Sequence, residues 1–361
     1  MENPITTAAS FALYHLPGAE DVVFISDEAP LQLDAYDALP DAPGFVIAPF
    51  QLENHSPLLF LRPQSLEHIP IEALPQDEVQ YTFTNDETAE REEYGKSFEV
   101  VESALRRKEA RKVVLSRRMQ LHLEGDAPID VRALMAKACR LYPRNFVAVW
   151  HTPQSGTWLV ATPECLLEQV TSTLWRTMAL AGTMSWEAGA PMGRHAYWSP
   201  KDRAEQEFVR DYIRECILPY AEQLEMSHTY PVRAGELAHL RTDFTFTLAQ
   251  PSEAGRLLAD LHPTPAVCGL PTTEARGIIA QAEPHSRRYY AGFAGPWHLE
   301  EATHLYVSLR CMNLDIAGRN CTLYAGGGIL RASTEGGEWW ETVRKAGTML
   351  RVLGIDGRFV P

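Results

Sequence analysis

The sequence lacks the features that mark membrane-bound and secreted proteins. No stretch of the 361 residues reaches the roughly 18 uncharged apolar residues that a membrane-spanning helix needs. The N-terminal residues MENPITTAAS do not place a basic segment before an apolar one. The six cysteines form no Cys-x-x-Cys pair, and no histidine neighbours them at zinc-ligand spacing. We therefore expect a cytoplasmic protein with reduced, structural thiols.

Basic residues are scarce in the first quarter of the chain. Residues 1–93 contain 18 acidic side chains and only two basic ones, Arg62 and Arg91. The remaining residues carry 31 basic and 29 acidic side chains, so the formal net charge of −14 arises from the first quarter. Binding to nucleic acid needs net or patterned positive charge. The charge distribution therefore argues against a nucleic-acid partner.

The rest of the composition is ordinary, with 45% hydrophobic and 22% charged residues, and predicts a globular protein with an ample core. Short apolar runs such as DVVFIS and GFVIAPF, separated by Pro, Gly and Asp, predict strands. The polar stretch 75–96 is interpreted as a connection. Helical spacing of apolar residues predicts helices over residues 97–112, 131–142, 201–223 and 338–350. Helices interleaved with paired strands predict an α+β fold.

Two of the predicted helices carry acidic residues at positions that call for a partner. Glu205 falls in the middle of an apolar face, with Asp202 on its flank. In the last helix, Glu338, Glu341 and Lys345 share one face. A buried carboxylate needs a basic partner, a metal or a proton, and Glu341 with Lys345 could also form an ordinary surface pair. Two carboxylate-bearing helices also suit a hard cation such as Mg²⁺.

Other residues could move protons or contact an anion. Gly326, Gly327 and Gly328 allow backbone N–H groups to approach a ligand, although tight turns and strand crossings use glycine as well. Lys112 opens a short strand and could act as a base in a closed pocket, or be solvated among the neighbouring basic residues. Glu164 follows a proline at a strand end, which suits a loop residue as well as a catalytic acid.

Nine segments, in their order along the chain, resemble the motifs of the chorismate-utilising enzymes. They are KVVLSR, ATPECLL, TMALAGT, KDRAEQEFV, HLRT, HPTPAVCGLP, YYAGFAGPW, VSLR and AGGGIL…EWWET. The resemblance covers about residues 112 to 350. It implies two large, mostly antiparallel sheets packed face to face with helices on the outside. Residues 1–93 would then be an acidic portion of one integrated domain, and residues 94–361 its chorismate-binding catalytic portion.

Two positions separate the members of this family. Members that add ammonia typically have Gln or another residue where this chain has Lys112, and members that add water have lysine. Aminodeoxychorismate synthases carry a nucleophilic lysine where this chain has Ala181, which cannot form a covalent adduct. The resemblance therefore implies an isochorismate synthase, of the kind that feeds menaquinone or catechol siderophore synthesis. Salicylate synthase, which goes on to expel pyruvate, uses the same acids and lysine and stays open.

The resemblance also implies roles for individual residues. Lys112 would take a proton from the water that attacks ring carbon 2 of chorismate, and Glu164 would donate one to the hydroxyl leaving carbon 4. Tyr290 and Arg310 would bind the enolpyruvyl carboxylate. The other expected substrate contacts are Thr183, His239, Gly327, Gly328 and Lys345.

A magnesium ion is the implied cofactor. Glu205 and Glu341 would hold it directly, and Asp202 and Glu338 would reach it through water. The expected partner is the small molecule chorismate, with no nucleic acid and no membrane, and the sequence is compatible with a monomer. The alternative from a different functional class is a non-catalytic metal-binding scaffold, in which these carboxylates only form ion pairs.

Overall fold

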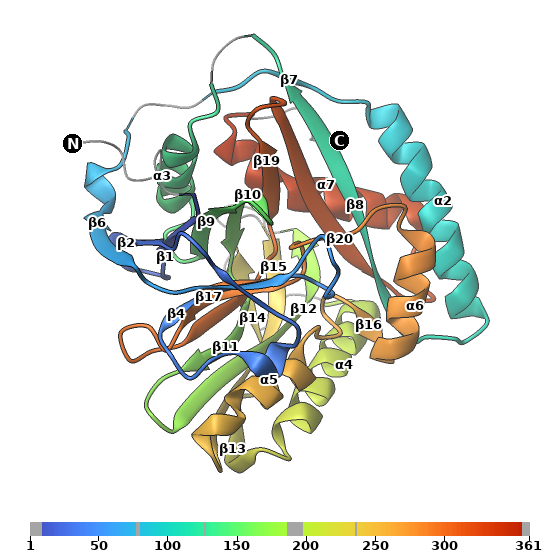
Figure 1. Cartoon of the computed structure of the whole chain (residues 1–361). Coiled ribbons are helices and arrows are strands. Elements are labelled where there is room, and N and C mark those ends of the chain that lie inside the picture. Colours follow the sequence, from blue (N-terminus) through green and yellow to red (C-terminus); the bar gives the residue numbers. More distant parts are fainter. Residues whose placement is uncertain (1–8, 77–79, 126–127, 186–197, 235–236, 356–361) are drawn as a thin grey trace.

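The computed structural model describes residues 9–76, 80–125, 128–185, 198–234 and 237–355 (Figure 1). Within these ranges the strands form two ten-stranded sheets, here called sheet A and sheet B. Every strand pairing given for them is antiparallel, as in the pairs of β1 with β9 and of β4 with β17. Residues 1–8, in which we looked for a targeting signal, lie outside the described ranges.

Sheet A has the strand order β16-β8-β20-β19-β10-β9-β1-β2-β6, and β7 also pairs with β8. Its strands are β1 (Phe11–His15), β2 (Asp21–Ser26), β6 (Ser65–Pro70), β7 (Phe83–Thr84), β8 (Lys112–Leu123), β9 (Phe146–Thr152), β10 (Gly156–Thr162), β16 (Gly269–Leu270), β19 (Cys311–Asp315) and β20 (Asn320–Ile329). Strands from the start, the middle and the end of the chain are therefore neighbours in one sheet.

Sheet B has the order β13-β15-β12-β11-β18-β17-β4-β5-β3, and β14 also pairs with β15. Its strands are β3 (Leu31–Leu33), β4 (Gly44–Ala48), β5 (Leu58–Leu61), β11 (Cys165–Gln169), β12 (Leu174–Ser185), β13 (Ala221–Met226), β14 (Tyr230–Ala234), β15 (Leu237–Leu248), β17 (Phe293–Trp297) and β18 (His304–Val307). The acidic first quarter thus contributes strands to both sheets.

The helices cover the sheets from outside (Figure 1). They are α2 (Glu87–Arg106), α3 (Val131–Leu141), α4 (Pro200–Ile217), α5 (Ala254–Leu261), α6 (Thr272–Ala282) and α7 (Glu335–Val352), with 3-10 turns η1 (Tyr36–Ala38), η2 (Ile71–Ala73) and η3 (Pro251–Glu253). Helices α2 and α6 pack on β8, α4 packs on β12 and β15, and α7 packs on β20. No helix of the described residues combines the length and apolar character that crossing a bilayer requires.

The core lies between the two sheets, and a second apolar layer lies on the outer face of sheet A. Along β1, Ala12 and Tyr14 belong to the inter-sheet core, whereas Phe11 and Leu13 belong to the outer layer. Successive side chains of a strand point to opposite faces, so a strand covered on both faces is apolar throughout. The α+β fold of two large antiparallel sheets with external helices is confirmed.

The predicted bounds of two helices are wrong, and the first of these helices ends at Arg106 rather than at residue 112, where β8 begins. Helix α2 begins at Glu87, so it includes much of the stretch interpreted as a connection, and residue 93 lies inside it. Asp86 caps this helix by accepting a hydrogen bond from the N–H of Ala89, and Tyr94 is buried. Helix α4 ends at Ile217 rather than near residue 223, because Pro219 has no N–H for a further helical turn.

Candidate active site

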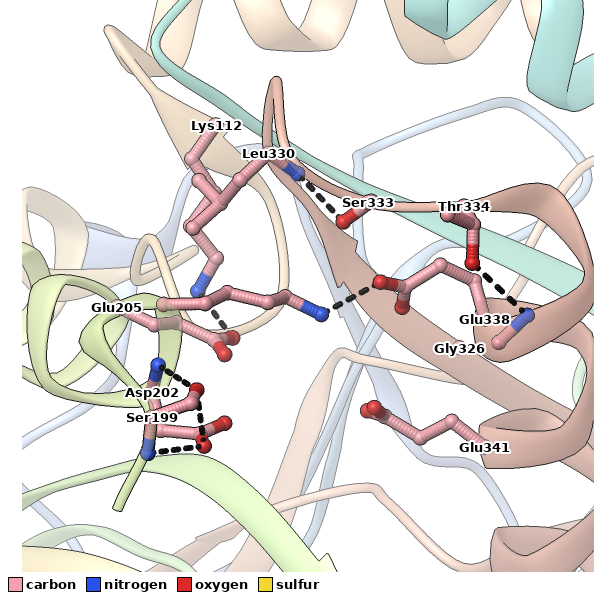
Figure 2. A network of polar contacts seen from close by, with 12 residues as sticks. Lys112, Ser199, Asp202, Glu205, Gly326, Leu330, Ser333, Thr334, Glu338 and Glu341 are labelled. Atoms are coloured by element: carbon pink, nitrogen blue, oxygen red, sulfur yellow. Dashed lines mark hydrogen bonds and ion pairs between the residues drawn. The ribbon is translucent and has the colours of Figure 1, made fainter.

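A pocket is lined by residues from both sheets and from helices α4 and α7. Its empty space, including the part open to solvent, is about 680 Å³. Eight of the thirteen predicted site residues line it: Glu164, Thr183, Glu205, His239, Tyr290, Arg310, Gly328 and Lys345. The structure places the other five outside this lining: Lys112, Asp202, Gly327, Glu338 and Glu341. Lys112, Asp202, Glu338 and Glu341 lie around a polar region between α4, α7 and the first residues of β8 (Figure 2).

Glycines of β20 allow carboxylates from the two helices to come close to the strand. A Cβ atom on Gly328 would lie 2.4 Å from Oε1 of Glu205 and 2.9 Å from Cε of Lys112. A Cβ atom on Gly327 would lie 3.0 Å from Oε2 of Glu338. The glycine run therefore makes room for acidic side chains on both sides of the strand.

The carboxylates of α4 and α7 point toward one space from opposite sides. Figure 2 shows Glu205 on one side and Glu338 with Glu341 on the other. Each of them forms an ion pair with a lysine. The pairs are Lys112–Glu205 (Nζ to Oε1, 2.9 Å), Lys201–Glu338, and Lys345–Glu341 (Nζ to Oε1, 2.7 Å). Asp202 is engaged differently, because Oδ2 accepts hydrogen bonds from the N–H and hydroxyl of Ser199 in the capping box of α4.

The charges of these groups shift one another's pKa values. Burial opposes ionisation of Glu341, but Lys345 and Lys201 lower the pKa of this carboxyl to about 2. Burial and the neighbouring Glu341 raise the pKa of Glu338. Burial alone would lower the pKa of Lys201, but the carboxylates of Glu338, Glu341 and Glu205 raise it. The region therefore gathers several carboxylates, and lysine ammonium groups neutralise their negative charge.

This donor set fits a hard divalent cation. Carboxylate oxygens are the protein ligands that Mg²⁺ prefers, and Oε2 of Glu338 is buried with no hydrogen-bond partner in the part of the chain that the structure describes. Among the described residues, no three acidic, histidine or cysteine side chains are gathered closely enough to hold a metal ion as they stand. The lysine pairs explain this, since they occupy carboxylate oxygens that a cation would need.

Lys112 and Glu164 are both buried. The side chain of Lys112 is 0% exposed and forms an ion pair with Glu205. Burial raises the pKa of Glu164 to about 7, against the opposing effect of Arg310, Lys112 and Lys345. Glu164 can therefore hold a proton near neutral pH and donate it to a ligand in the pocket.

His239 lines the pocket with a neutral imidazole ring. Burial lowers the pKa of its ring to about 3, and Nδ1 lies 3.0 Å from the carbonyl oxygen of Gly182. A carbonyl only accepts, so Nδ1 carries the proton, and the buried Nε2, which has no partner among the described residues, is an acceptor. Gly182 has a φ of +71°, and a Cβ atom there would lie 3.0 Å from the carbonyl oxygen of Asp202. Oγ1 of Thr183, the next residue, lies 3.3 Å from Nδ1 of His239.

Arg310 and Tyr290 provide the side of the pocket that suits an anion. Arg310 lies between β18 of sheet B and β19 of sheet A, where the chain crosses between the sheets with a φ of +48°. Burial lowers the pKa of Arg310 and raises that of Tyr290. The ring of Tyr290 stacks on Tyr324 with centroids 5.5 Å apart, and Gly326 leaves room for its hydroxyl group. A planar guanidinium beside a phenol suits a carboxylate.

Two residues of the site, Lys201 and Tyr324, were not predicted from the sequence. Lys201 lies in the first turn of α4, where a positive charge opposes the helix dipole, so its position there was a signal of acidic neighbours. Tyr324 lines the pocket two residues before the glycine run, and the alternation along β20 could have placed it on the same face as Gly326 and Gly328.

Comparisons with known proteins agree on the family. The family described as "Chorismate binding enzyme" matches residues 59–354. The chain is 34% identical to isochorismate synthase EntC of Escherichia coli (strain K12) over 252 residues, which are 68% of this chain and 62% of that relative's length. The chain therefore spans less than two thirds of the curated relative that it matches.

Solved structures share the fold at low sequence identity. The structure of MenF, the menaquinone-specific isochorismate synthase from Escherichia coli, superposes with a TM-score of 0.81 at 23% identity, covering 96% of this chain and 89% of that one. Anthranilate synthase component I from Streptococcus pneumoniae TIGR4 gives 0.71 at 17% identity, covering 97% and 93%. Two neighbours named for different reactions thus share one architecture.

Proposed function

Because this chain belongs to the family of chorismate-binding enzymes, we propose that it converts chorismate to isochorismate. The observation that carries the proposal is a buried glutamic acid in the pocket, with a pKa near 7, and a buried lysine next to the pocket-lining Gly328, close enough to affect that pKa. A base and an acid of this kind are what the exchange of a ring hydroxyl requires. The name of EntC, isochorismate synthase, supports the same reaction.

The reaction conserves atoms if one residue removes a proton and the other supplies one. Lys112 accepts a proton from water, whose oxygen bonds to ring carbon 2 as the double bonds shift. The bond between carbon 4 and its hydroxyl oxygen breaks, and Glu164 donates the proton with which that oxygen leaves as water. In the structure Nζ of Lys112 lies 2.9 Å from Oε1 of Glu205, so this step requires that the contact opens.

The charged groups of the pocket suit the two carboxylates of the substrate. Arg310 and Tyr290 would bind the enolpyruvyl carboxylate, and Lys345 supplies a second positive charge in the lining. Gly328 lines the pocket, and its backbone N–H would add a donor. Thr183 and His239 line the pocket as well.

We propose Mg²⁺ as the cofactor, held by Glu205 and Glu341 with Asp202 and Glu338 in support. Such a cation neutralises and orients a substrate carboxylate. Glu341→Gln should weaken the binding of Mg²⁺ measured by isothermal titration calorimetry without substrate, because one anionic ligand is lost. Glu335→Gln on the same helix is the control, since its side chain pairs with Arg91. Equal Mg²⁺ affinity in both variants would contradict the assignment.

Salicylate synthase is the second candidate, because the same lysine and acids serve both reactions. Incubating the purified protein with chorismate and MgCl₂, followed by chromatography of the products, separates the two. We expect isochorismate without pyruvate, which would feed menaquinone or catechol siderophore synthesis. Salicylate with pyruvate would establish the second candidate, and turnover only with ammonia would contradict both.

A further inference from the structure

A buried ion pair lies behind the pocket, at the end of α6. The guanidinium of Arg287 and the carboxylate of Glu283 are joined by two hydrogen bonds, from Nε to Oε2 (2.8 Å) and from Nη2 to Oε1 (2.5 Å). Their side chains are 2% and 6% exposed. Burying two charges costs free energy that a pair alone seldom returns, so the remaining hydrogen bonds of such a pair decide what it does.

Those remaining bonds go to the backbone of residues that form the pocket. Arg287 donates from Nη1 to the carbonyl of Val267 (2.7 Å) and from Nη2 to the carbonyl of Val114 (2.7 Å), and both residues line the pocket. The guanidinium also lies over the ring of Tyr290, 5.9 Å from its centroid. One side chain therefore touches three separate parts of the wall.

The Arg287–Glu283 pair also forms hydrogen bonds with the edge of β8, beyond the point where the neighbouring strand β16 ends. Strand β16 pairs with β8 only at Lys112 and Val113, and the N–H of Val114 donates to the carbonyl of Cys268. At the next positions the carbonyl of Val114 accepts from Arg287, and the N–H of Ser116 donates to Glu283 (2.8 Å). Side chains thus take the place of a strand beside the segment that follows Lys112.

We propose that Arg287, held by Glu283, is a positioning residue that fixes the Lys112-bearing end of β8 relative to Tyr290. Lys112 lies in β8 of sheet A, whereas Tyr290 lies in the turn before β17 of sheet B, and the guanidinium contacts both of these segments. Misplacement of reacting groups by about 1 Å costs roughly 100-fold in rate. This inference rests on the proposed function, because it assigns Lys112 and Tyr290 to the reaction.

Arg287→Lys tests the proposal, with Arg288→Lys as the matched control. Lysine keeps the charge beside Glu283 but cannot reach both carbonyls with a planar fork. Arg288 is adjacent, but its guanidinium bonds to the carbonyl of Ser155 (2.7 Å) and to Asn313, neither of which lines the pocket. We expect kcat for isochorismate formation to fall roughly 10- to 100-fold in Arg287→Lys. We expect Arg288→Lys to keep kcat and KM near the wild-type values.

Glu283→Gln and the double variant extend the test. If the pair acts as a unit, Glu283→Gln lowers kcat in the same direction, and the double variant is no slower than the more affected single one. Thermal unfolding is measured for every variant, because a merely structural role would lower Tm while leaving kcat and KM of the folded protein unchanged. That result in Arg287→Lys would overturn the inference. Absence of isochorismate formation by the wild-type protein would instead overturn the proposed function.

Discussion

Lys112 is a fully buried cation whose ion pair is with Glu205 of another element. Burial without a partner would cost several kcal/mol, so the pair accounts for how this lysine is accommodated beneath the pocket. It also joins the proposed base to a proposed ligand of the cation. A change in the charge around Glu205 therefore directly changes the electrostatic environment of Lys112.

Replacing Lys112 tests its proposed role as a base. Lys112→Gln should lower kcat for isochorismate formation by roughly 100- to 10,000-fold, the usual contribution of general base catalysis, because an amide cannot take the proton from water. The amide can still donate to Glu205, so the fold should persist, which circular dichroism and thermal unfolding would check. Lys96→Gln, at an exposed position of α2, is the control. Near-normal turnover by Lys112→Gln would show that another group is the base.

The pKa of Glu164 predicts the alkaline side of the pH profile. Burial raises this pKa to about 7, and the proposed acid must be protonated to act. The value of kcat/KM should therefore fall about tenfold per pH unit above pH 7, since this parameter reports the free enzyme. Glu164→Gln should remove most of the activity, and its residual rate should not show this decline. A wild-type profile that stays level to pH 9 would contradict the role of Glu164.

At the scale of elements, β20 depends on glycine where two helices bring carboxylates against it. Gly328→Ala would place a methyl group within 2.4 Å of Oε1 of Glu205, so Glu205 or Lys112 must move. We expect kcat to fall roughly 100-fold, as for other misplaced catalytic groups, and the affinity for Mg²⁺ to fall with it.

Gly347→Ala in α7 is the control for this substitution. Nothing lies within 4 Å of a Cβ atom there, and alanine stabilises a helix interior by about 1 kcal/mol relative to glycine. Its kcat should match the wild type, and its Tm should rise. The prediction for Gly328 fails if both variants keep full activity in the same assay.

At the scale of the whole molecule, two buried histidines couple stability to pH. Burial lowers the pKa of His239 and of His262 to about 3. In the unfolded chain both rings take up protons below about pH 6.5, so stability is lost as the pH falls from 6.5 toward 3. Glu164 acts in the opposite direction between pH 7 and 4.5, because the folded protein binds its proton first. The single, smaller pKa shift of Glu164 does not offset the two larger pKa shifts of the histidines.

His262→Gln isolates one of these contributions. The ring Nε2 of His262 lies 3.1 Å from the carbonyl oxygen of Pro49, and an amide can keep that donor without titrating. The wild-type protein should lose about 2 kcal/mol per histidine between pH 6.5 and pH 5. The drop in Tm between pH 7 and pH 5 should therefore be smaller in His262→Gln, measured by calorimetry at a series of pH values. An equal drop in both proteins would exclude His262 as a source.

Local patterns determined the chemistry that this sequence can carry. Helical spacing placed Glu205 on an apolar face and Glu338 near Glu341, alternation predicted the strands, and the motif order indicated the family, since all of these depend on residues close together in the chain. The same patterns left the partner of Glu205 open between a base, a metal and a proton. Only the tertiary structure brings Lys112 to it, because Lys112 belongs to sheet A and Glu205 to a helix on sheet B. The contact of Arg287 with Val114 was hidden for the same reason: packing joins these residues across 173 positions of the chain, and no local spacing records that they meet.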